Sequence, residues 1–286
     1  MDNPITKLKE NISNLTAAQQ KVADYIIKHP MEVAFLTVDQ LAGLVGTSTT
    51  TIMRLTFNLG YSGYAEFQKG LQELLRNTAA PHTRLEANLK TLNQSNLWIR
   101  CAEKQISNIQ NTVEMNSEET LSKVIEMIIH ANRIYCASVR SGLPVAQYLT
   151  HGFNRLLGNC ELVISDQTDW IDKVYSLSSS DVIIATSFPR YARRTVEFVK
   201  RAKENHSQVI AITDSYASPL VKHSDIILLC NSSSLAFHNS VISAMFLADY
   251  MISSIAINYP DKIKNRLDRV NKILTEMNYH YDRIDL

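Results

Sequence analysis

The apolar residues of this chain follow one spacing in its first part and another in the rest. Residues 1–76 show only the three-to-four-residue spacing of short amphipathic helices, separated by turn-forming residues. Residues 77–96 are polar and weakly periodic, which is typical of a linker, and residues 97–114 return to an amphipathic helical pattern. We therefore expect a helical domain over 1–76, a linker and connecting helix over 77–115, and a second domain over 116–286.

In the second domain, short runs of continuously apolar residues alternate with longer amphipathic segments. The apolar runs lie at 133–138, 160–164, 181–187, 208–214 and 225–230. Predicted helices precede, separate and follow them at 117–131, 142–157, 169–177, 193–205, 239–258 and 261–278. Strands that are apolar at every position and alternate with helices are typical of a parallel sheet covered on both faces. The pattern predicts an α/β domain.

Two predicted helices joined by a glycine turn lie within residues 37–67 of the first domain. The first helix has an apolar face made of Val38, Leu41, Leu44 and Val45. Gly46 permits a sharp turn, and Ser48 is placed to cap the second helix by accepting its free backbone N–H groups. The second helix directs one apolar side inward, formed by Ile52, Leu55 and Leu59. This arrangement is typical of a helix-turn-helix.

The outer face of the second helix carries mostly short or polar side chains. Such a helix can lie close in the major groove of DNA and reach the base edges. The residues expected to contact DNA are Thr47, Ser48, Thr49, Thr50, Thr51, Met53, Arg54, Phe57 and Asn58. A plain three-helix bundle is the alternative, because residues 1–76 hold seven basic and seven acidic residues, whereas DNA-binding domains are usually basic.

The overall composition excludes some classes of protein but does not identify one. The net charge is +1, with 45% hydrophobic and 20% charged residues, as in ordinary globular proteins. No apolar run approaches the roughly 20 residues that cross a bilayer, and the first residues lack the apolar core of a signal peptide. We expect a cytoplasmic protein with no membrane partner. The cysteines, at positions 101, 136, 160 and 230, form no CxxC pair, which favours reduced, mostly buried thiols and no metal site.

The stretch LTAAQQKVADYIIKHPMEVAFLTVDQLAGLVGTSTTTIMRLTFNLGYSGYAEFQ, at 15–68, resembles the N-terminal domain of RpiR-family bacterial transcriptional regulators. The matching positions include Val22, Ala23, Ile26, Pro30, Leu41, Ala42, Ser48, Thr51, Arg54, Leu59, Gly60, Gly63 and Phe67. The resemblance implies that this domain binds operator DNA. The chain departs from the family where basic residues often end the recognition helix. Phe57 and Asn58 stand there, so either the contact with DNA is less electrostatic or Lys69, Arg76 and Arg84 nearby supply the missing charge.

Residues 120–258 resemble the sugar isomerase (SIS) domain of the same regulators and of some aldose–ketose isomerases. The resemblance implies a five-stranded parallel sheet in a Rossmann-like three-layer sandwich. Ligands of open α/β sheets bind beyond the carboxyl ends of the strands, where we expect loops 137–142, 186–194 and 231–240. Each loop leads into a helix, whose N-terminus attracts anions, and arginine suits carboxylate or phosphate. The residues expected to contact the ligand are Ser138, Arg140, Ser141, Ser187, Arg190, Tyr191, His238 and Ser240.

The loop SFPRYAR, at 187–193, differs from the phosphosugar loop of typical SIS domains. That loop reads Ser-x-Ser-Gly-x-Thr, whereas Pro189, Arg190 and Ala192 stand here at the second serine, the glycine and the threonine. Pro189 has no backbone N–H, and Ala192 has no hydroxyl. The loop resembles that of an SFPRY-type subgroup of the family with less uniform effectors. We expect a small anionic metabolite that bears a carboxylate, or, as the second choice, a phosphosugar.

Three functions compete on these residues. The first, which we favour, is a DNA-binding regulator that senses the anion without a cofactor, as a homodimer or homotetramer on a palindromic operator. The second is an SIS-type sugar-phosphate isomerase. Isomerisation needs an acid–base group, and the three loops hold no glutamate and a single histidine, His238, so we expect no catalytic residue. The third is a ligand sensor that does not bind DNA.

Overall fold

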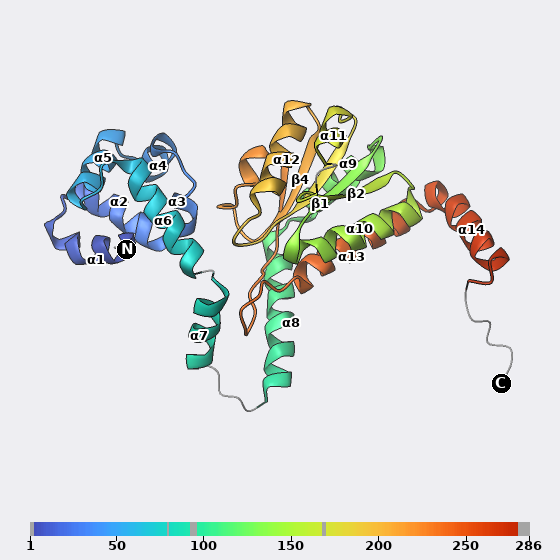
Figure 1. Ribbon diagram of the computed structural model, residues 1–286, viewed down its shortest axis with the longest axis horizontal. Helices are drawn as coiled ribbons and strands as arrows, with labels where there is room; N and C mark the ends of the chain where they lie inside the picture. The colour runs from blue at the N-terminus through green and yellow to red at the C-terminus, as the bar shows by residue number, and fades with distance from the viewer. Residues whose placement is uncertain (1–2, 79, 92–95, 168–169, 280–286) are drawn as a thin grey trace. The chain divides into compact units, whose positions relative to one another are not determined.

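The computed structural model describes residues 3–78, 80–91, 96–167 and 170–279. These residues divide into two compact units (Figure 1). One unit contains the N-terminal helices and the other contains the sheet with most of its flanking helices.

The first unit is built from short helices around one apolar core. The helices are α1 (Pro4–Asn11), α2 (Ala17–Lys28), α3 (Pro30–Val33), α4 (Val38–Val45), α5 (Thr49–Asn58), α6 (Tyr64–Thr78) and α7 (Pro81–Thr91), with a 3₁₀ turn at Ile12–Asn14. Thr16 and Thr37 begin α2 and α4 with capping boxes, in which each threonine and the glutamine three residues later satisfy one another's backbone N–H groups. The core includes Leu8, Val22, Ile26, Leu41, Ile52, Leu55, Phe67 and Leu71, all fully buried.

Two details of this unit differ from the sequence expectations. Leu44 was expected on the apolar face of α4, but its side chain is 55% exposed, because Leu41, Ala42 and Val45 already form the buried face. The polar segment expected to be a linker contains the helix α7, which starts at a proline and is rich in residues of high helix propensity.

The second unit contains a five-stranded sheet that is parallel throughout, which confirms the predicted α/β class. The strands are β1 (Ile134–Ser138), β2 (Cys160–Ile164), β3 (Val182–Thr186), β4 (Gln208–Thr213) and β5 (Ile226–Leu229). They lie in the order β2-β1-β3-β4-β5. In the register, Cys136 of β1 lies between Leu162 of β2 and Ile184 of β3. Every residue of β1 and β3 is buried, as their continuous apolar sequences require.

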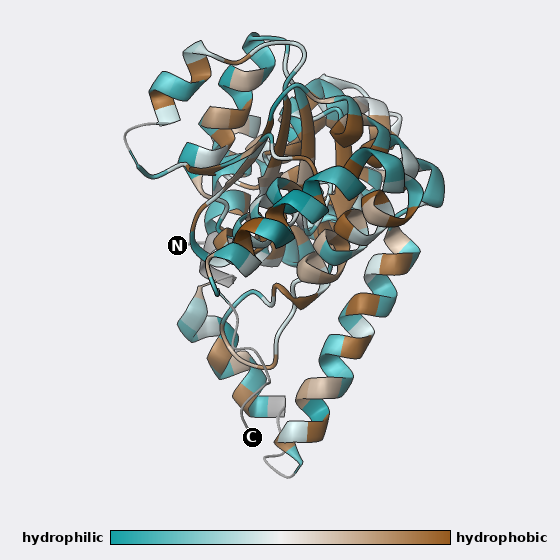
Figure 2. Cartoon of the chain, turned by 90° about the vertical axis from the view of Figure 1, so that its right-hand side faces the viewer, coloured by the Kyte–Doolittle hydropathy of each residue, from teal (hydrophilic) through white to brown (hydrophobic). Residues whose placement is uncertain are grey.

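Helices cover both faces of this sheet, because the side chains of a strand alternate between its faces. The helices of the unit are α8 (Leu97–Met115), α9 (Glu118–His130), α10 (Leu143–Leu156), α11 (Trp170–Tyr175), α12 (Arg193–Glu204), α13 (Ile242–Asn258) and α14 (Pro260–Glu276), with 3₁₀ turns at Arg140–Gly142 and Val221–His223. Cys136 and Ile184 pack against α9, α10 and α13, whereas Tyr135 and Ile183 pack with Phe198 of α12. Figure 2 shows the hydrophobic strands enclosed between these layers.

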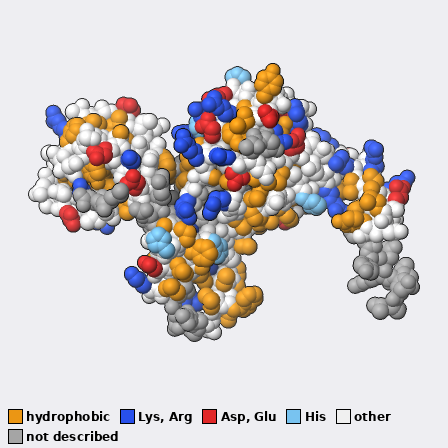
Figure 3. Space-filling model, in the orientation of Figure 1, with side chains coloured by type: hydrophobic (Ala, Val, Ile, Leu, Met, Phe, Trp, Pro, Cys, Tyr) orange, Lys and Arg blue, Asp and Glu red, His pale blue; other side chains and the backbone are white. Residues whose placement is uncertain are grey.

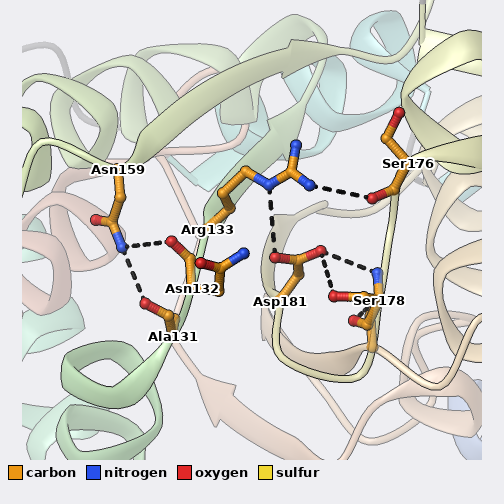
Figure 4. A network of polar contacts seen from close by, with 8 residues as sticks. Ala131, Asn132, Arg133, Asn159, Ser176, Ser178 and Asp181 are labelled. Atoms are coloured by element: carbon orange, nitrogen blue, oxygen red, sulfur yellow. Dashed lines mark hydrogen bonds and ion pairs between the residues drawn. The ribbon is translucent and has the colours of Figure 1, made fainter.

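A polar network closes the amino-terminal edge of the sheet (Figure 4). The buried carboxylate of Asp181, just before β3, lies with its Oδ1 3.8 Å from Nε of Arg133, and its Oδ2 accepts hydrogen bonds from the backbone N–H and the hydroxyl of Ser178. The Asn159 amide donates to the backbone oxygens of Ala131 and Asn132. A buried carboxylate held in this way joins the strand ends and their loops, so we interpret the network as structural.

The cysteines of the second unit differ in exposure. Cys136, Cys160 and Cys230 are buried, and the Sγ atoms of the first two lie 3.6 Å apart on β1 and β2. Burial raises the pKa values of Cys136 and Cys230, which keeps both groups as neutral thiols. Cys101, on α8, is exposed.

No single helix in the described part of the chain is long and apolar enough to cross a membrane. The helices α13 and α14 pass that test only together, and the chain bends by 103° between them.

Candidate functional site

The turn between α4 and α5 has the geometry expected of a helix-turn-helix. Gly46 ends α4 with φ of 67°, a left-handed conformation that glycine adopts without steric cost. Ser48 then caps α5, because its Oγ accepts a hydrogen bond from the backbone N–H of Thr51 at 3.2 Å. Ile52 and Leu55 are fully buried and fix α5 on the core of its unit. The remaining face of α5 is therefore directed away from that core.

The residues predicted to contact DNA lie along that outer face. Ser48, Thr50, Arg54, Phe57 and Asn58 are exposed, with Phe57 at 52%. The half-buried members of the set are Thr47, Thr49, Thr51 and Met53. Thr56, which the sequence argument did not select, is buried and donates its hydroxyl to the backbone oxygen of Met53. The accessible face thus combines small hydroxyls, one arginine, one amide and one aromatic ring.

The second candidate site lies at the carboxyl-terminal edge of the sheet. In the strand order β2-β1-β3-β4-β5, the chain turns to one side after β1 and to the other after β3. Ligands of open parallel sheets bind at such a reversal, in the crevice outside the carboxyl ends of the two strands. The loops that follow β1 and β3 carry Arg140 and Arg190. The topology therefore brings together two of the predicted ligand loops.

Both arginines are held in an unusual backbone conformation. Arg140 has φ of 54° and Arg190 has φ of 72°, in the left-handed region that non-glycine residues rarely adopt. Both side chains are exposed, and neither forms an ion pair with another residue in the described ranges. Strained backbone of this kind is concentrated at ligand sites, where the surrounding structure maintains it. The two guanidinium groups are thus available to an anion.

Polar groups at the ends of β1 and β3 lie close together between these loops. The hydroxyl of Ser138, at the end of β1, donates to the backbone oxygen of Thr186, at the end of β3, at 2.7 Å. A Cβ at Gly142 would lie 2.4 Å from the Ser138 hydroxyl and 3.0 Å from that backbone oxygen, so only glycine fits there. The Thr186 hydroxyl is buried without a hydrogen-bond partner among the residues that the structure describes. Such an orphaned polar group is a rare feature that a bound ligand or water can satisfy.

The other predicted residues of the β3 loop are tied to the end of β4. Ser187 is buried, its backbone N–H donates to Ile212 at 3.1 Å, and its backbone oxygen accepts from the Thr213 hydroxyl at 2.8 Å. The Tyr191 hydroxyl donates to Oδ1 of Asp214 at 2.9 Å. These bonds fix both sides of Arg190. Ser141, in the β1 loop, is half-buried beside Arg140.

The third predicted loop connects this edge to helix α8. His238 is exposed, whereas Ser240 is buried and donates its hydroxyl to Oε1 of Gln105, on α8, at 2.6 Å. Between them, the Asn239 amide donates to the backbone oxygen of Pro189 at 3.1 Å. A continuous set of hydrogen bonds therefore runs from the residue before Arg190 to α8.

The polar face of α8 is bound to the same loop at further points. The amide nitrogen of Asn108 donates to the backbone oxygen of Ser233 at 2.7 Å, and the Thr112 hydroxyl accepts from the backbone N–H of Asn231 at 3.1 Å. Asn108 and Thr112 are fully buried. Buried amides and hydroxyls therefore join α8 to this loop.

Several residues of this edge were not selected as candidate site residues from the sequence. They are Gly142, Thr186, Asn239 and Gln105. The sequence gives a weak signal for Gly142, which follows a serine in a turn-forming stretch, and for Thr186, which ends an apolar run. It gives none for Gln105, because the partner of that side chain lies 135 residues further along the chain.

No group of three or more histidine, cysteine, aspartate or glutamate side chains is placed to hold a metal ion in the ranges that the structure describes.

Comparison with known protein families identifies the type of domain in each unit. The model of the helix-turn-helix domain of the rpiR family matches residues 3–78, and the SIS domain model matches residues 127–254. An HTH-type transcriptional regulator of Caldanaerobacter subterraneus subsp. tengcongensis is 27% identical over 262 residues, covering 90% of this chain and 86% of the relative. The HTH-type transcriptional regulator HexR of Pseudomonas aeruginosa is 23% identical and covers 80% of this chain and 79% of its own.

Solved structures share the fold over nearly the whole chain. The Vibrio vulnificus NanR protein, complexed with ManNAc-6P, superimposes with a TM-score of 0.67 at 22% identity, covering 96% of this chain and 99% of that one. The sugar isomerase domain of an RpiR transcription factor from Sphaerobacter thermophilus gives a TM-score of 0.60 at 22% identity, covering 62% of this chain and 99% of that one.

A helix-turn-helix unit followed by a parallel α/β unit of this topology is typical of a class of transcriptional regulators. Within that class, this chain belongs to the RpiR family and carries its helix-turn-helix and SIS domains. The predicted family and fold are confirmed.

Proposed function

We propose that this regulator reads a palindromic operator through α5, as a homodimer or homotetramer in the bacterial cytoplasm, and senses a small anionic metabolite between Arg140 and Arg190. The metabolite is a phosphosugar or a carboxylate-bearing compound. Its binding changes the affinity of the regulator for the operator.

One observation carries the proposed effector site. Two exposed arginines are held with left-handed backbone on the loops of adjacent strands, without an ion-pair partner among the described residues. Arginine binds carboxylate and phosphate through two parallel hydrogen bonds, so the pair suits an anion with at least two oxygens. The phosphosugar in the NanR structure supports an anionic ligand for this fold. Pro189 and Ala192, which lack donors at cradle positions, favour an anion held by side chains.

Sugar-phosphate isomerisation is the competing function, and the chemistry of this edge argues against it. An isomerase needs a general acid or base beside the reacting carbons. The three loops contain no glutamate, and His238 is exposed in the loop ahead of α13. Asp214 accepts a hydrogen bond from Tyr191, which leaves it in a positioning role. The site is equipped to bind an anion and not to move its protons.

The hydrogen bonds between the effector loop and α8 support the proposed coupling. An anion that draws Arg190 inward also moves Pro189, which Asn239 contacts, and Ser240 passes the displacement to Gln105. Two sites are coupled when each ligand prefers a different conformation of the element they share. In this proposal that element is α8, which follows the helix-turn-helix unit in the sequence.

The proposal is tested by footprinting the full-length protein on the DNA upstream of its own gene and of the neighbouring genes. A protected palindrome, whose half-sites are spaced by about one helical turn or a multiple of it, is expected. Titration with phosphosugars and small carboxylates is then expected to shift the operator affinity. Absence of a sequence-specific complex under every condition contradicts the DNA-binding role. Equal affinity at zero and saturating effector contradicts the sensing role.

A further inference from the structure

Helix α8 has its polar and apolar faces reversed relative to an ordinary surface helix. Its buried side chains are polar, and the most buried are Asn108 and Thr112. Its outer face exposes Ile99 at 54%, Ile106 at 56% and Val113 at 55%. A surface helix normally turns its apolar stripe toward the core of its own domain. The apolar stripe of α8 therefore has no partner within the described part of its own unit.

The apolar residues of α8, of which Ile109 is half-buried, recur with the spacing of a helix that packs on another helix. Ile99, Ile106 and Val113 are separated by seven residues each, and Ala102 and Ile109 lie three residues after the first two. This is the a and d spacing of a heptad repeat, in which the side chains of one helix pack between those of another. The pattern spans the whole of the 19-residue helix. We call these five residues the heptad face.

The heptad face exposes enough apolar area to take part in an interface between two subunits. Trp98, which borders it, is 87% exposed. Together these side chains offer on the order of 500 Å² of apolar surface, above the few hundred Å² that isolated monomers usually expose in one patch. Two such faces in contact would bury on the order of 1,000 Å², the lower limit for a specific interface. Figure 3 shows hydrophobic side chains gathered over the N-terminal end of α8.

We infer that the heptad face of α8 is the surface on which a second copy of this chain packs, α8 against α8. A repeat with the same residue type at successive a positions is complementary to itself, as a two-fold interface requires. The inference rests on the proposed homo-oligomer and names its contact surface. It also places the subunit interface on the back of the helix whose front holds the effector-coupled loop.

The test uses disulfide trapping in the full-length protein with Cys101→Ser, which removes the exposed native thiol. Ile106→Cys is expected to form an intermolecular disulfide within minutes of mild oxidation at low micromolar concentration. Ile171→Cys is the matched control, because Ile171 is 62% exposed on α11 and lies outside the heptad face. Crosslinking of Ile171→Cys to the same extent, or no crosslinking of Ile106→Cys, overturns the inference. The second result would favour an occupant from the same chain, such as α7, which exposes Leu85 and Leu89.

Two further variants determine the direction of the helix pair. Self-crosslinking of Ile99→Cys supports parallel helices. Crosslinking confined to a mixture of Ile99→Cys with Val113→Cys supports antiparallel helices. Both results support the heptad face as the interface.

A second test measures the dimerisation of charge variants by sedimentation. Ile106→Asp is expected to raise the dissociation constant of the dimer at least about tenfold, since it places a carboxylate at the centre of an apolar contact, whereas Ile171→Asp leaves the constant unchanged. A wild-type protein that stays monomeric contradicts the proposed oligomer itself. A wild-type dimer that Ile106→Asp does not weaken contradicts only the heptad-face interface. Effector binding, measured separately, tests the sensing site and does not decide between these two outcomes.

Discussion

Arg140 and Arg190 adopt backbone conformations that glycine would adopt more easily. Each costs on the order of 1–3 kcal/mol, which the surrounding structure must offset. The bonds from Ser187 and Tyr191 to the end of β4 hold the loop around Arg190. The backbone at Arg190 is therefore held in one conformation, and the Thr186 hydroxyl, which has no partner among the described residues, lies at the end of the strand that precedes it.

Arg190→Ala is expected to weaken effector binding about tenfold to a hundredfold, because a hydrogen bond to a charged group contributes about 1.5–3 kcal/mol. Affinity for the operator without effector should be unchanged. Isothermal titration with the effector found by screening measures the first quantity, and fluorescence anisotropy with operator DNA measures the second. Arg155→Ala is the matched control, since Arg155 is an exposed arginine near the C-terminal end of α10. Equal effector affinity in both variants would remove Arg190 from the site.

Arg54 is the arginine on the exposed face of α5. Arg54→Ala is expected to lower operator affinity by about 1–3 kcal/mol, the discrimination that a bidentate contact with a base provides. Lys28→Ala removes the same charge from the exposed end of α2 and should leave most of the affinity intact. Anisotropy titrations at fixed salt compare the two variants. If they lose affinity equally, Arg54 contributes only charge and α5 is not the recognition helix.

At the scale of the element, α5 depends on a short turn that positions its first residue. Gly46 ends α4 in the left-handed conformation, and Ser48 begins α5 by capping it. Buried Ile52 and Leu55 then set the rotation of the helix about its axis. The face offered to DNA is thus determined by a cap and two core contacts.

Ser48→Ala is expected to reduce the free energy of unfolding by about 0.5–2 kcal/mol, since the backbone N–H of Thr51 loses the side-chain oxygen that caps the helix. Urea unfolding followed by circular dichroism measures the change. Ser13→Ala, an exposed serine in the 3₁₀ turn after α1, is the control and should change stability by less than about 0.5 kcal/mol. Equal stability of Ser48→Ala and the wild type would show that the cap contributes nothing.

Across the whole molecule, the proposal joins two contacts between residues far apart in the sequence to one exposed surface. Pro189 contacts Asn239, Ser240 contacts Gln105, and α8 carries the heptad face on its other side. An effector-induced shift of α8 would then alter the pairing of two subunits. Half-sites of a palindromic operator have a fixed spacing, so such a change alters affinity for DNA.

Gln105→Ala is expected to uncouple the two functions. Effector binding and effector-free operator binding should persist, while the ratio of operator affinities with and without effector should fall at least about threefold toward one, because the typical coupling energy of 1–3 kcal/mol passes through this contact in the proposal. Gln110→Ala alters an exposed glutamine of the same helix and should preserve the ratio. An unchanged ratio in Gln105→Ala would exclude this route of coupling.

More of the fold than of the candidate site could be predicted from the sequence, because the fold depends more on signals that are local in the chain. The five strands lie within two residues of their predicted ends, because continuous apolar runs can be satisfied only inside a covered sheet. Helix α5 also follows from local signals, namely Gly46, Ser48 and the spacing of Ile52 and Leu55. Leu44 was misplaced, because its side of the helix depends on what the neighbouring helices cover.

Local signals in the sequence predicted the two domains, the parallel sheet, helix α5 and the loop that carries Arg190. Periodicity and turn chemistry are local properties, so they can be recognised in the sequence of a short segment. Only the tertiary structure decided that Arg140 and Arg190 flank the same reversal of strand order, that Ser240 contacts Gln105, and that α8 turns its heptad face outward. These facts depend on contacts between residues remote in sequence, and such contacts exist only once the chain has folded.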